Sequence, residues 1–336
     1  MTEPPAPAPT PAPAGRRRLL VWFAILGPGL IAANAGNDAG GIATYASAGA
    51  QFAYASLFLM VLVTVALVVV QEMSARLGAY TGEGLMSLIR EQFPLRMAAF
   101  AIACLLVANV GLVVSEFAGI GAAFELFGVS RYVVVPISAV LIWSVVVFGS
   151  YRYVERVFLL LSMVFVAYPI AVVLSRPDLS AVVSHSVLPH FPANREFLFL
   201  AVAIVGTTIT PYMQLYQAAA VADRGVGPDD YPDARIDSVA GSIFANIVSM
   251  AIIIATAAAI GGTGPLQSAK QAAEALKPVA GAWAEALFGL GLLGASALAA
   301  AVIPLATAYA VAEAVGAERS TSRRFREAPL FGGLFT

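Results

Sequence analysis

Residues 27–41 read GPGLIAANAGNDAGG and lie inside an apolar stretch that covers residues 19–50. Such a stretch is long enough for a helix to cross a lipid bilayer, which takes about 20 residues. Its centre nevertheless carries two asparagines, Asp38 and the pair Gly40 and Gly41. Glycine is a poor helix former. The sequence therefore predicts that helix geometry fails within this stretch, at membrane depth.

The energetic cost of placing the charged aspartate of this break at membrane depth must be offset by a partner. A carboxylate at membrane depth costs about 3 kcal/mol or more unless a partner offsets that cost. Backbone groups freed by a break are tolerated only where protein buries them or where they line a watery cavity. A cation bound at Asp38 is the simplest compensation. The alternative is that Asp38 caps the second half-helix, with its carboxylate on free N–H groups.

A second apolar stretch, residues 196–222, shows the same kind of interruption. Its middle carries Gly206, Thr207, Thr208, Thr210 and Pro211. Proline removes a backbone N–H and displaces the carbonyl one turn earlier. Two broken spans, each opening what looks like a five-span unit, are typical of inverted-repeat transporters with a site near the bilayer midplane.

The composition of the whole chain supports this interpretation. With 60% hydrophobic and 12% charged residues, its 336 residues cannot form a water-soluble domain. We expect an all-α integral membrane protein: a disordered cytoplasmic tail over residues 1–18 and one transporter domain over 19–336. After a basic stretch, residues 328–335 form a new apolar run that predicts the start of a ninth span, with the last spans missing. The eight complete spans are expected at 19–50, 52–75, 97–127, 132–148, 154–174, 196–222, 236–260 and 281–315.

Basic residues predict the orientation, because Lys and Arg concentrate in cytoplasmic loops. With the N-terminus in the cytoplasm, fourteen of the 19 Lys and Arg residues lie in cytoplasmic segments. We therefore expect a multi-pass protein of the inner or plasma membrane with a cytoplasmic N-terminus. The basic residues left for the outer loops are Arg131, Arg176, Arg195, Lys270 and Lys277.

Other polar residues inside the spans are less specific. Asn109 and Glu116 lie seven apart, so they share one helical stripe that should face the bundle interior. Glu116 could carry protons or ions along this pathway, or it could hydrogen-bond to a neighbouring helix. Asp237 and Asn246 are nine apart and fall on opposite faces, so they cannot share one site.

The residues in the two predicted breaks resemble the motifs of a known family. Asp38-Ala39-Gly40-Gly41 resembles the Asp-Pro-Gly-Asn motif of the NRAMP divalent-metal transporters, and Thr210-Pro211-Tyr212 resembles their Met-Pro-His motif. The similarity extends from Arg18 to the end of the chain. It implies a leucine-transporter-like fold with two inverted repeats and broken first and sixth helices. Further stretches that resemble the family are Gly27-Pro28-Gly29, Ala75-Arg76-Leu77-Gly78, Glu155-Arg156, Ala234-Arg235-Ile236-Asp237 and Ala272-Ala273-Glu274-Ala275-Leu276.

The resemblance also implies a metal site. Asp38 would be the metal-binding carboxylate, with the backbone carbonyls of Ala35 and Thr207 as further ligands. Gly41 stands where the family has an asparagine ligand, and Thr210 stands where it has a methionine. These replacements predict hard divalent ions such as magnesium and manganese, with iron also accepted, as in NRAMP-related magnesium carriers.

Further differences from the family pattern concern residues that are linked to proton movement. Tyr212 and Gln217 replace two family histidines, and Gly119 replaces one of two acids linked to proton movement, whereas Glu116 matches the other. We therefore expect a secondary transporter, not an enzyme, that works by alternating access with weak or absent proton coupling.

The expected partners follow from this function. They are divalent metal ions and the lipid bilayer, with no nucleic acid; the oligomeric state stays open. No cofactor is expected, since the metal ion is the transported substrate. The alternative is an amino-acid or organic-cation symporter on the same fold, in which the broken helix holds a substrate carboxylate and Asp38 holds an amine.

Overall fold

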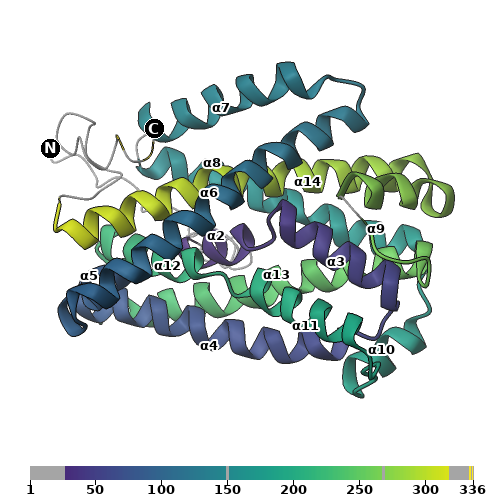
Figure 1. The fold of residues 1–336 in the computed structure, drawn as a ribbon, viewed down its shortest axis with the longest axis horizontal. Coiled ribbons are helices and arrows are strands. Elements are labelled where there is room, and N and C mark those ends of the chain that lie inside the picture. The colour runs from purple at the N-terminus through teal and green to yellow at the C-terminus, as the bar shows by residue number, and fades with distance from the viewer. Residues whose placement is uncertain (1–26, 149–150, 267–268, 318–332, 334, 336) are drawn as a thin grey trace, which may run out of the picture.

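The structure, a computed structural model, describes residues 27–148, 151–266, 269–317, 333 and 335. The chain is a bundle of helices packed side by side (Figure 1). The expected tail and most of the expected ninth span lie outside the described residues. The helices are α2 (Pro28–Ala35), α3 (Ala39–Phe52), α4 (Leu57–Thr81), α5 (Leu85–Gln92), α6 (Leu95–Leu126), α7 (Arg131–Phe148), α8 (Tyr151–Met163), η1 (Val164–Val166), α9 (Ala167–Ser175), α10 (Leu179–Val187), α11 (Arg195–Thr208), α12 (Pro211–Asp223), α13 (Tyr231–Ile260) and α14 (Ala269–Val315).

Among the described residues, seven segments are long and apolar enough to cross a membrane. Together with the interrupted pair α2 and α3, they match the eight predicted spans, so the multi-span all-α class is confirmed. Most boundaries fall within a few residues of the predicted ones, but α13 and α14 begin earlier, at Tyr231 and Ala269. The seven segments are Leu57–Thr81, Leu95–Leu126, Arg131–Phe148, Arg156–Ser175, Arg195–Asp223, Tyr231–Ile260 and Ala286–Val315.

The first break lies within the predicted stretch. Helix α2 ends at Ala35 and α3 begins at Ala39, so the non-helical residues are Gly36, Asn37 and Asp38. Gly40 and Gly41, although poor helix formers, lie in the first turn of α3. The reason is that Asp38 provides an N-cap, and a capped helix start tolerates glycine better than an uncapped one.

The N-terminus of α2 is held by a buried carboxylate on α13. Asp237 accepts hydrogen bonds from the backbone N–H groups of Gly27, Gly29 and Leu30, at 3.0, 2.7 and 3.2 Å. The two backbones also touch, since a Cβ added to Gly29 would lie 2.6 Å from the backbone nitrogen of Ser238. Asp237 thus satisfies N–H groups that would otherwise be unpaired at membrane depth, and it fixes α2 against α13.

The second break is as predicted. Helix α11 ends at Thr208 and α12 begins at Pro211, with Thr210 as the N-cap residue of α12. Proline at the first helical position loses no hydrogen bond, because that N–H has no partner within the helix. Two broken spans are therefore present, as an inverted-repeat transporter requires.

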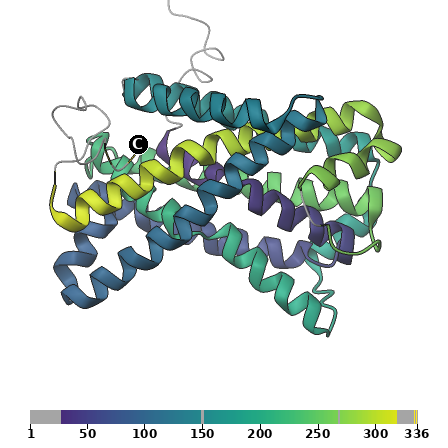
Figure 2. The ribbon, with the colours of Figure 1, turned by 45° about the horizontal axis from the view of Figure 1, so that its top comes forward.

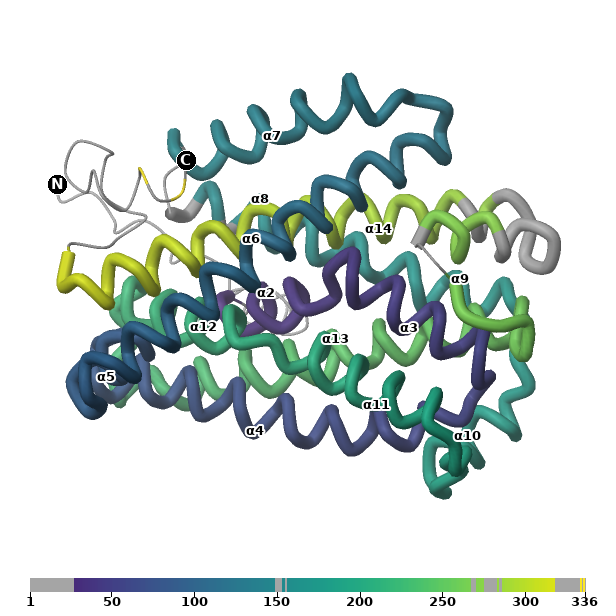
Figure 3. The backbone as a smooth tube through the Cα atoms, viewed as in Figure 1, coloured from purple at the N-terminus to yellow at the C-terminus, as the bar shows by residue number. Residues whose placement is uncertain are grey.

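The helices are arranged so that the half-helices lie in the middle of the bundle. In Figure 3, α2 and α12 lead from the breaks toward the end that holds α5 and the C-terminal end of α14, called the α5 end here. Helices α3 and α11 lead toward the opposite end, which holds α10. Helix α6 packs along α14, and α7 lies on the outside of the bundle in the views of Figures 1 and 2.

The outward faces are apolar. Val107 on α6 is 77% exposed and Val140 on α7 is 63% exposed, which suits contact with lipid rather than water. The one cysteine, Cys104, is also exposed on α6.

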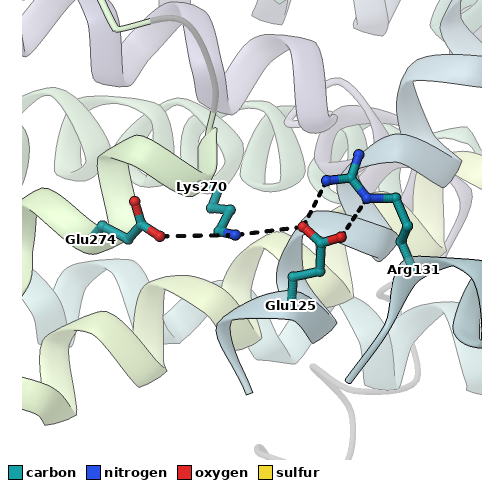
Figure 4. Close-up of polar contacts among 4 residues, drawn as sticks. All are labelled: Glu125, Arg131, Lys270 and Glu274. Carbon is teal, nitrogen blue, oxygen red and sulfur yellow. Dashed lines mark hydrogen bonds and ion pairs between the residues drawn. The ribbon is translucent and has the colours of Figure 1, made fainter. Parts of the chain in front are cut away.

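Charged side chains gather at the α10 end, where three helices meet. Glu125 at the end of α6 bonds to Arg131 at the start of α7, and its Oε2 lies 3.5 Å from Lys270 Nζ on α14 (Figure 4). Lys270 also lies 3.9 Å from Glu274. Exposed ion pairs contribute about 1 kcal/mol or less each, so this group tethers the helix ends without dominating stability.

Candidate metal site

Asp38 stands at the centre of the first break. It is 1% exposed. Its Oδ1 accepts a hydrogen bond from the backbone N–H of Gly41 at 2.6 Å, which makes it the N-cap of α3. Its Oδ2 is buried and finds no hydrogen-bond partner within the described part of the chain. The capping alternative is thus correct for one oxygen, and the other remains for a ligand.

Three oxygens surround the open side of Gly41. A Cβ added there would lie 3.1 Å from Thr207 Oγ1, 3.2 Å from Asp38 Oδ1 and 3.2 Å from the Gly36 carbonyl oxygen. A carboxylate, a hydroxyl and a carbonyl therefore lie around the position that the Cβ of a larger residue would occupy. Oxygens of these kinds are the ligands of hard divalent cations.

Thr210 and Ala35 lie on the α5 side of this space. Thr210 is buried at the N-terminus of α12, and its side chain lies beside the Tyr212 hydroxyl. The Ala35 carbonyl accepts a hydrogen bond from Tyr212 Oη at 2.7 Å. Tyr212 thus occupies one lone pair of a carbonyl that the sequence assigned to the metal, and it joins the ends of α2 and α12.

Glu116 on α6 reaches the same break. Its Oε2 accepts a hydrogen bond from the backbone N–H of Ala39 at 3.0 Å, and its carboxylate is close enough to interact electrostatically with Asp38. Its Oε1 has no hydrogen-bond partner among the residues that the structure describes. Both carboxylates therefore sit at the N-terminus of α3, where the helix dipole favours negative charge.

The loop between α2 and α3 is fixed from the side of α13. Asn37 Nδ2 donates to the Ala245 carbonyl at 2.9 Å, and its Oδ1 accepts from Ser249 Oγ at 2.6 Å. The hydroxyls of Tyr45 on α3 and Thr208 on α11 are 2.8 Å apart, which links the two breaks. These bonds hold Asp38 in place before any ion binds.

The structure separates the predicted site residues into two groups. Asp38, Gly41 and Thr207 surround one space, and Ala35 and Thr210 lie at its α5 side. Asn109 shares the buried face of α6 with Glu116, as predicted, but its Nδ2 donates to Thr307 Oγ1 on α14 at 2.7 Å. Asn109 therefore contacts α14 rather than the break.

Sequence reasoning missed other residues of the site. The Gly36 carbonyl joins the oxygen group, and the Met213 thioether packs on Gly36, since a Cβ there would lie 2.7 Å from Met213 Sδ. Tyr45 was also missed, although a tyrosine seven residues after Asp38 on the same helical stripe was a usable signal. Backbone carbonyls give no signal in a sequence.

The charged groups at the site are two carboxylates, Asp38 at the start of α3 and Glu116 on α6. Across the described ranges, no group of three or more His, Cys, Asp and Glu side chains could hold a metal ion. The donor groups beside the first break are therefore two carboxylates, neutral oxygens and the Met213 thioether.

Comparison with known proteins places these features in context. Residues 29–335 match the family model described as natural resistance-associated macrophage protein-like, Nramp. The divalent metal cation transporter MntH of Aeromonas hydrophila is 31% identical over 291 residues, which cover 84% of this chain and 71% of that protein. MntH of Yersinia enterocolitica is 31% identical over 283 residues, covering 81% of this chain and 68% of that protein.

The fold also has solved counterparts. A crystal structure of the manganese transporter of Eremococcus coleocola, in complex with an aromatic bis-isothiourea compound, superposes with a TM-score of 0.71 at 18% sequence identity. The match covers 96% of this chain and 77% of that one. The overall helical arrangement is therefore shared with that structure.

Proposed function

This chain belongs to the Nramp family, and on that premise we propose that it carries hard divalent cations, magnesium and manganese first, by alternating access around Asp38. It is a multi-pass membrane protein and a transporter of divalent metal cations, not an enzyme. The metal ion is its substrate. The choice of ion, the ligands and the transport cycle are the parts that we propose.

The observation that carries the proposal is the buried, unshared Oδ2 of Asp38 beside three converging oxygens. Burying a charged oxygen without a partner is costly, and a divalent cation removes that cost. Asp38 is also the only carboxylate in either break. The Gly41 N–H bonds to Oδ1 of Asp38, and the bonds of Asn37 fix the loop that carries Asp38. The position of Oδ2 is therefore set before an ion binds.

Ligand type supports the choice of ion. Thr210 offers a hydroxyl where a thioether would favour softer metals. Gly41 leaves room where a larger residue would contribute a ligand or fill the space. An ion that keeps part of its water shell, as magnesium tends to do, fits a site with few protein ligands. Affinity should therefore be modest, since fewer ligands offset less of the dehydration cost.

The placement of the half-helices supports alternating access. Helices α2 and α12 lie between the site and the α5 end, and α3 and α11 lie between the site and the α10 end (Figure 3). Movement of one pair opens the site to one side only. We place the α5 end in the cytoplasm, because most Lys and Arg residues lie in segments on that side.

The test is uptake of a panel of metals into liposomes that contain the protein. Magnesium, manganese, iron, cadmium and calcium are offered separately and then in competition. We expect uptake of magnesium and manganese, with little preference for cadmium or iron. Strong preference for cadmium over magnesium would contradict the proposed selectivity, and absence of uptake for every metal would contradict transport by this chain.

A further inference from the structure

The α5 end of the bundle is held closed by the last turns of α14. Glu313 on α14 is 2% exposed. Its Oε2 accepts hydrogen bonds from the backbone N–H groups of Met86 and Ser87, in the first turn of α5, at 3.0 and 3.2 Å. A carboxylate on the free N–H groups of a helix start makes charge-assisted bonds that are about twice as strong as neutral ones.

The contact between α14 and α5 is close as well as polar. Arg90 on α5 donates through Nη1 to the Glu313 carbonyl at 3.0 Å, so α5 bonds to both the side chain and the backbone of Glu313. A Cβ added to Gly84 would lie 1.8 Å from Glu313 Oε1, and one added to Gly316 would lie 2.7 Å from Arg90 Nη1. Because Gly84 and Gly316 have no side chains, α5 and α14 can pack this closely.

The same turns of α14 also hold α12. Tyr309 lies four residues before Glu313, and its hydroxyl donates to Asp223 Oδ2, at the C-terminal end of α12, at 2.7 Å. Helix α12 is buried from Tyr212 to Val221, and α2 is buried along its whole length. The two half-helices between the site and the α5 end are therefore enclosed in this conformation.

We propose that Glu313 and Tyr309 form the latch that keeps the α5 end closed, and that both contacts break when this end opens. The proposal rests on the alternating-access function above. An ion bound at Asp38 can reach the α5 end only if α2 or α12 separates from its neighbours. Separation of α12 from α14 must break the hydrogen bond between Tyr309 and Asp223, and separation of α5 from α14 must break the bonds to Glu313. The latch sets how often the end opens; it does not bind the metal.

The test measures how readily a buried position on α12 becomes accessible. Ala220, which is 1% exposed, is replaced by cysteine in a Cys104→Ser background, because Cys104 is the one native cysteine. The labelling rate with a polar maleimide is then measured without metal. Glu313→Ala removes the carboxylate, and Gly84→Ala places a methyl group where that carboxylate lies. Both variants should raise the rate about tenfold, as expected for loss of bonds to a charged group.

The control is Glu91→Gln, which changes an exposed carboxylate on α5 and should leave the rate unchanged. Tyr309→Phe should give a smaller increase, because it removes one hydrogen bond. Equal rates in Glu313→Ala, Gly84→Ala and the control would overturn the latch, even if the protein takes up metal. Raised rates in a protein that transports no metal would uphold the latch and overturn the proposed function. A single cooperative thermal unfolding transition, with a Tm close to that of the Ala220→Cys parent, verifies that both variants are folded.

Discussion

Glu116 Oε2 accepts the backbone N–H of Ala39 at 3.0 Å, so α6 provides a second carboxylate at the start of α3, one residue after Asp38. The sequence offered two interpretations of Glu116, an ion or proton carrier and a carboxylate bonded to a neighbouring helix. The structure shows the second geometry. Five predictions follow from this arrangement and from the site beside it.

Asp38 is predicted to be required for metal binding. Asp38→Asn retains an oxygen that can cap α3, whereas Asp38→Ala also loses the cap, at a cost of about 1 kcal/mol. Calorimetry should show no manganese binding by either variant, and thermal unfolding should show a lower Tm for the alanine variant. Asp178→Ala is the control, because Asp178 caps α10 at an exposed position. Unchanged affinity in Asp38→Asn would remove Asp38 from the site.

Glu116 is predicted to act on metal binding by positioning α3. The amide oxygen of Glu116→Gln can still accept the Ala39 N–H, so manganese affinity should stay within a few-fold of wild type. Glu116→Ala leaves that N–H unpaired, which costs about 1–3 kcal/mol, and affinity should fall about tenfold. If the glutamine variant loses as much affinity as the alanine variant, the charge of Glu116 matters more than its hydrogen bond.

The open side of Gly41 is predicted to be space for the ion. Gly41→Ala places a methyl group 3.1–3.2 Å from the three oxygens, so metal affinity should fall at least tenfold. Stability should not fall with it, because alanine is favoured over glycine in a helix by about 0.5–1 kcal/mol. Gly111→Ala is the matched control, since a Cβ there meets nothing within 4 Å. Normal affinity in Gly41→Ala would place the ion elsewhere.

Thr210 is predicted to set selectivity. Thr210→Met supplies a thioether, so cadmium affinity should rise relative to magnesium, by about tenfold in competition binding. Thr263→Met, on an exposed turn, controls for methionine elsewhere in the protein. A cadmium-to-magnesium ratio equal to that of wild type would mean that Thr210 does not face the ion.

Metal uptake is predicted to be weakly coupled to proton entry, or uncoupled. No histidine lies in a predicted span, and Gly119 stands where the family has a second acid in the third span. A pH-sensitive dye inside proteoliposomes should report little acidification when manganese enters. A relative that carries the family's methionine and histidines is the reference. Acidification equal to that of the relative would contradict this prediction.

The sequence predicted the class of protein and the two broken spans. These conclusions hold because polar side chains and helix breaks in the hydrocarbon region of a bilayer are costly unless protein groups, water or ions pair with them. The site assignment itself stays a proposal. Within the stretch that was predicted to break, the structure locates the non-helical residues at 36–38, while the cap formed by Asp38 keeps Gly40 and Gly41 helical.

By itself, therefore, the sequence determined that this chain crosses a membrane repeatedly and that Asp38 lies where a membrane-spanning helix is interrupted. Only the tertiary structure decided which oxygens meet there. The Gly36 carbonyl, Thr207 Oγ1 and Asp38 Oδ1 converge because two half-helices from distant parts of the chain face each other. The contact between Glu313 and α5 spans 227 residues in the same way. Hydropathy and helix propensity act locally along the chain, whereas convergence of groups from distant segments depends on how the helices pack.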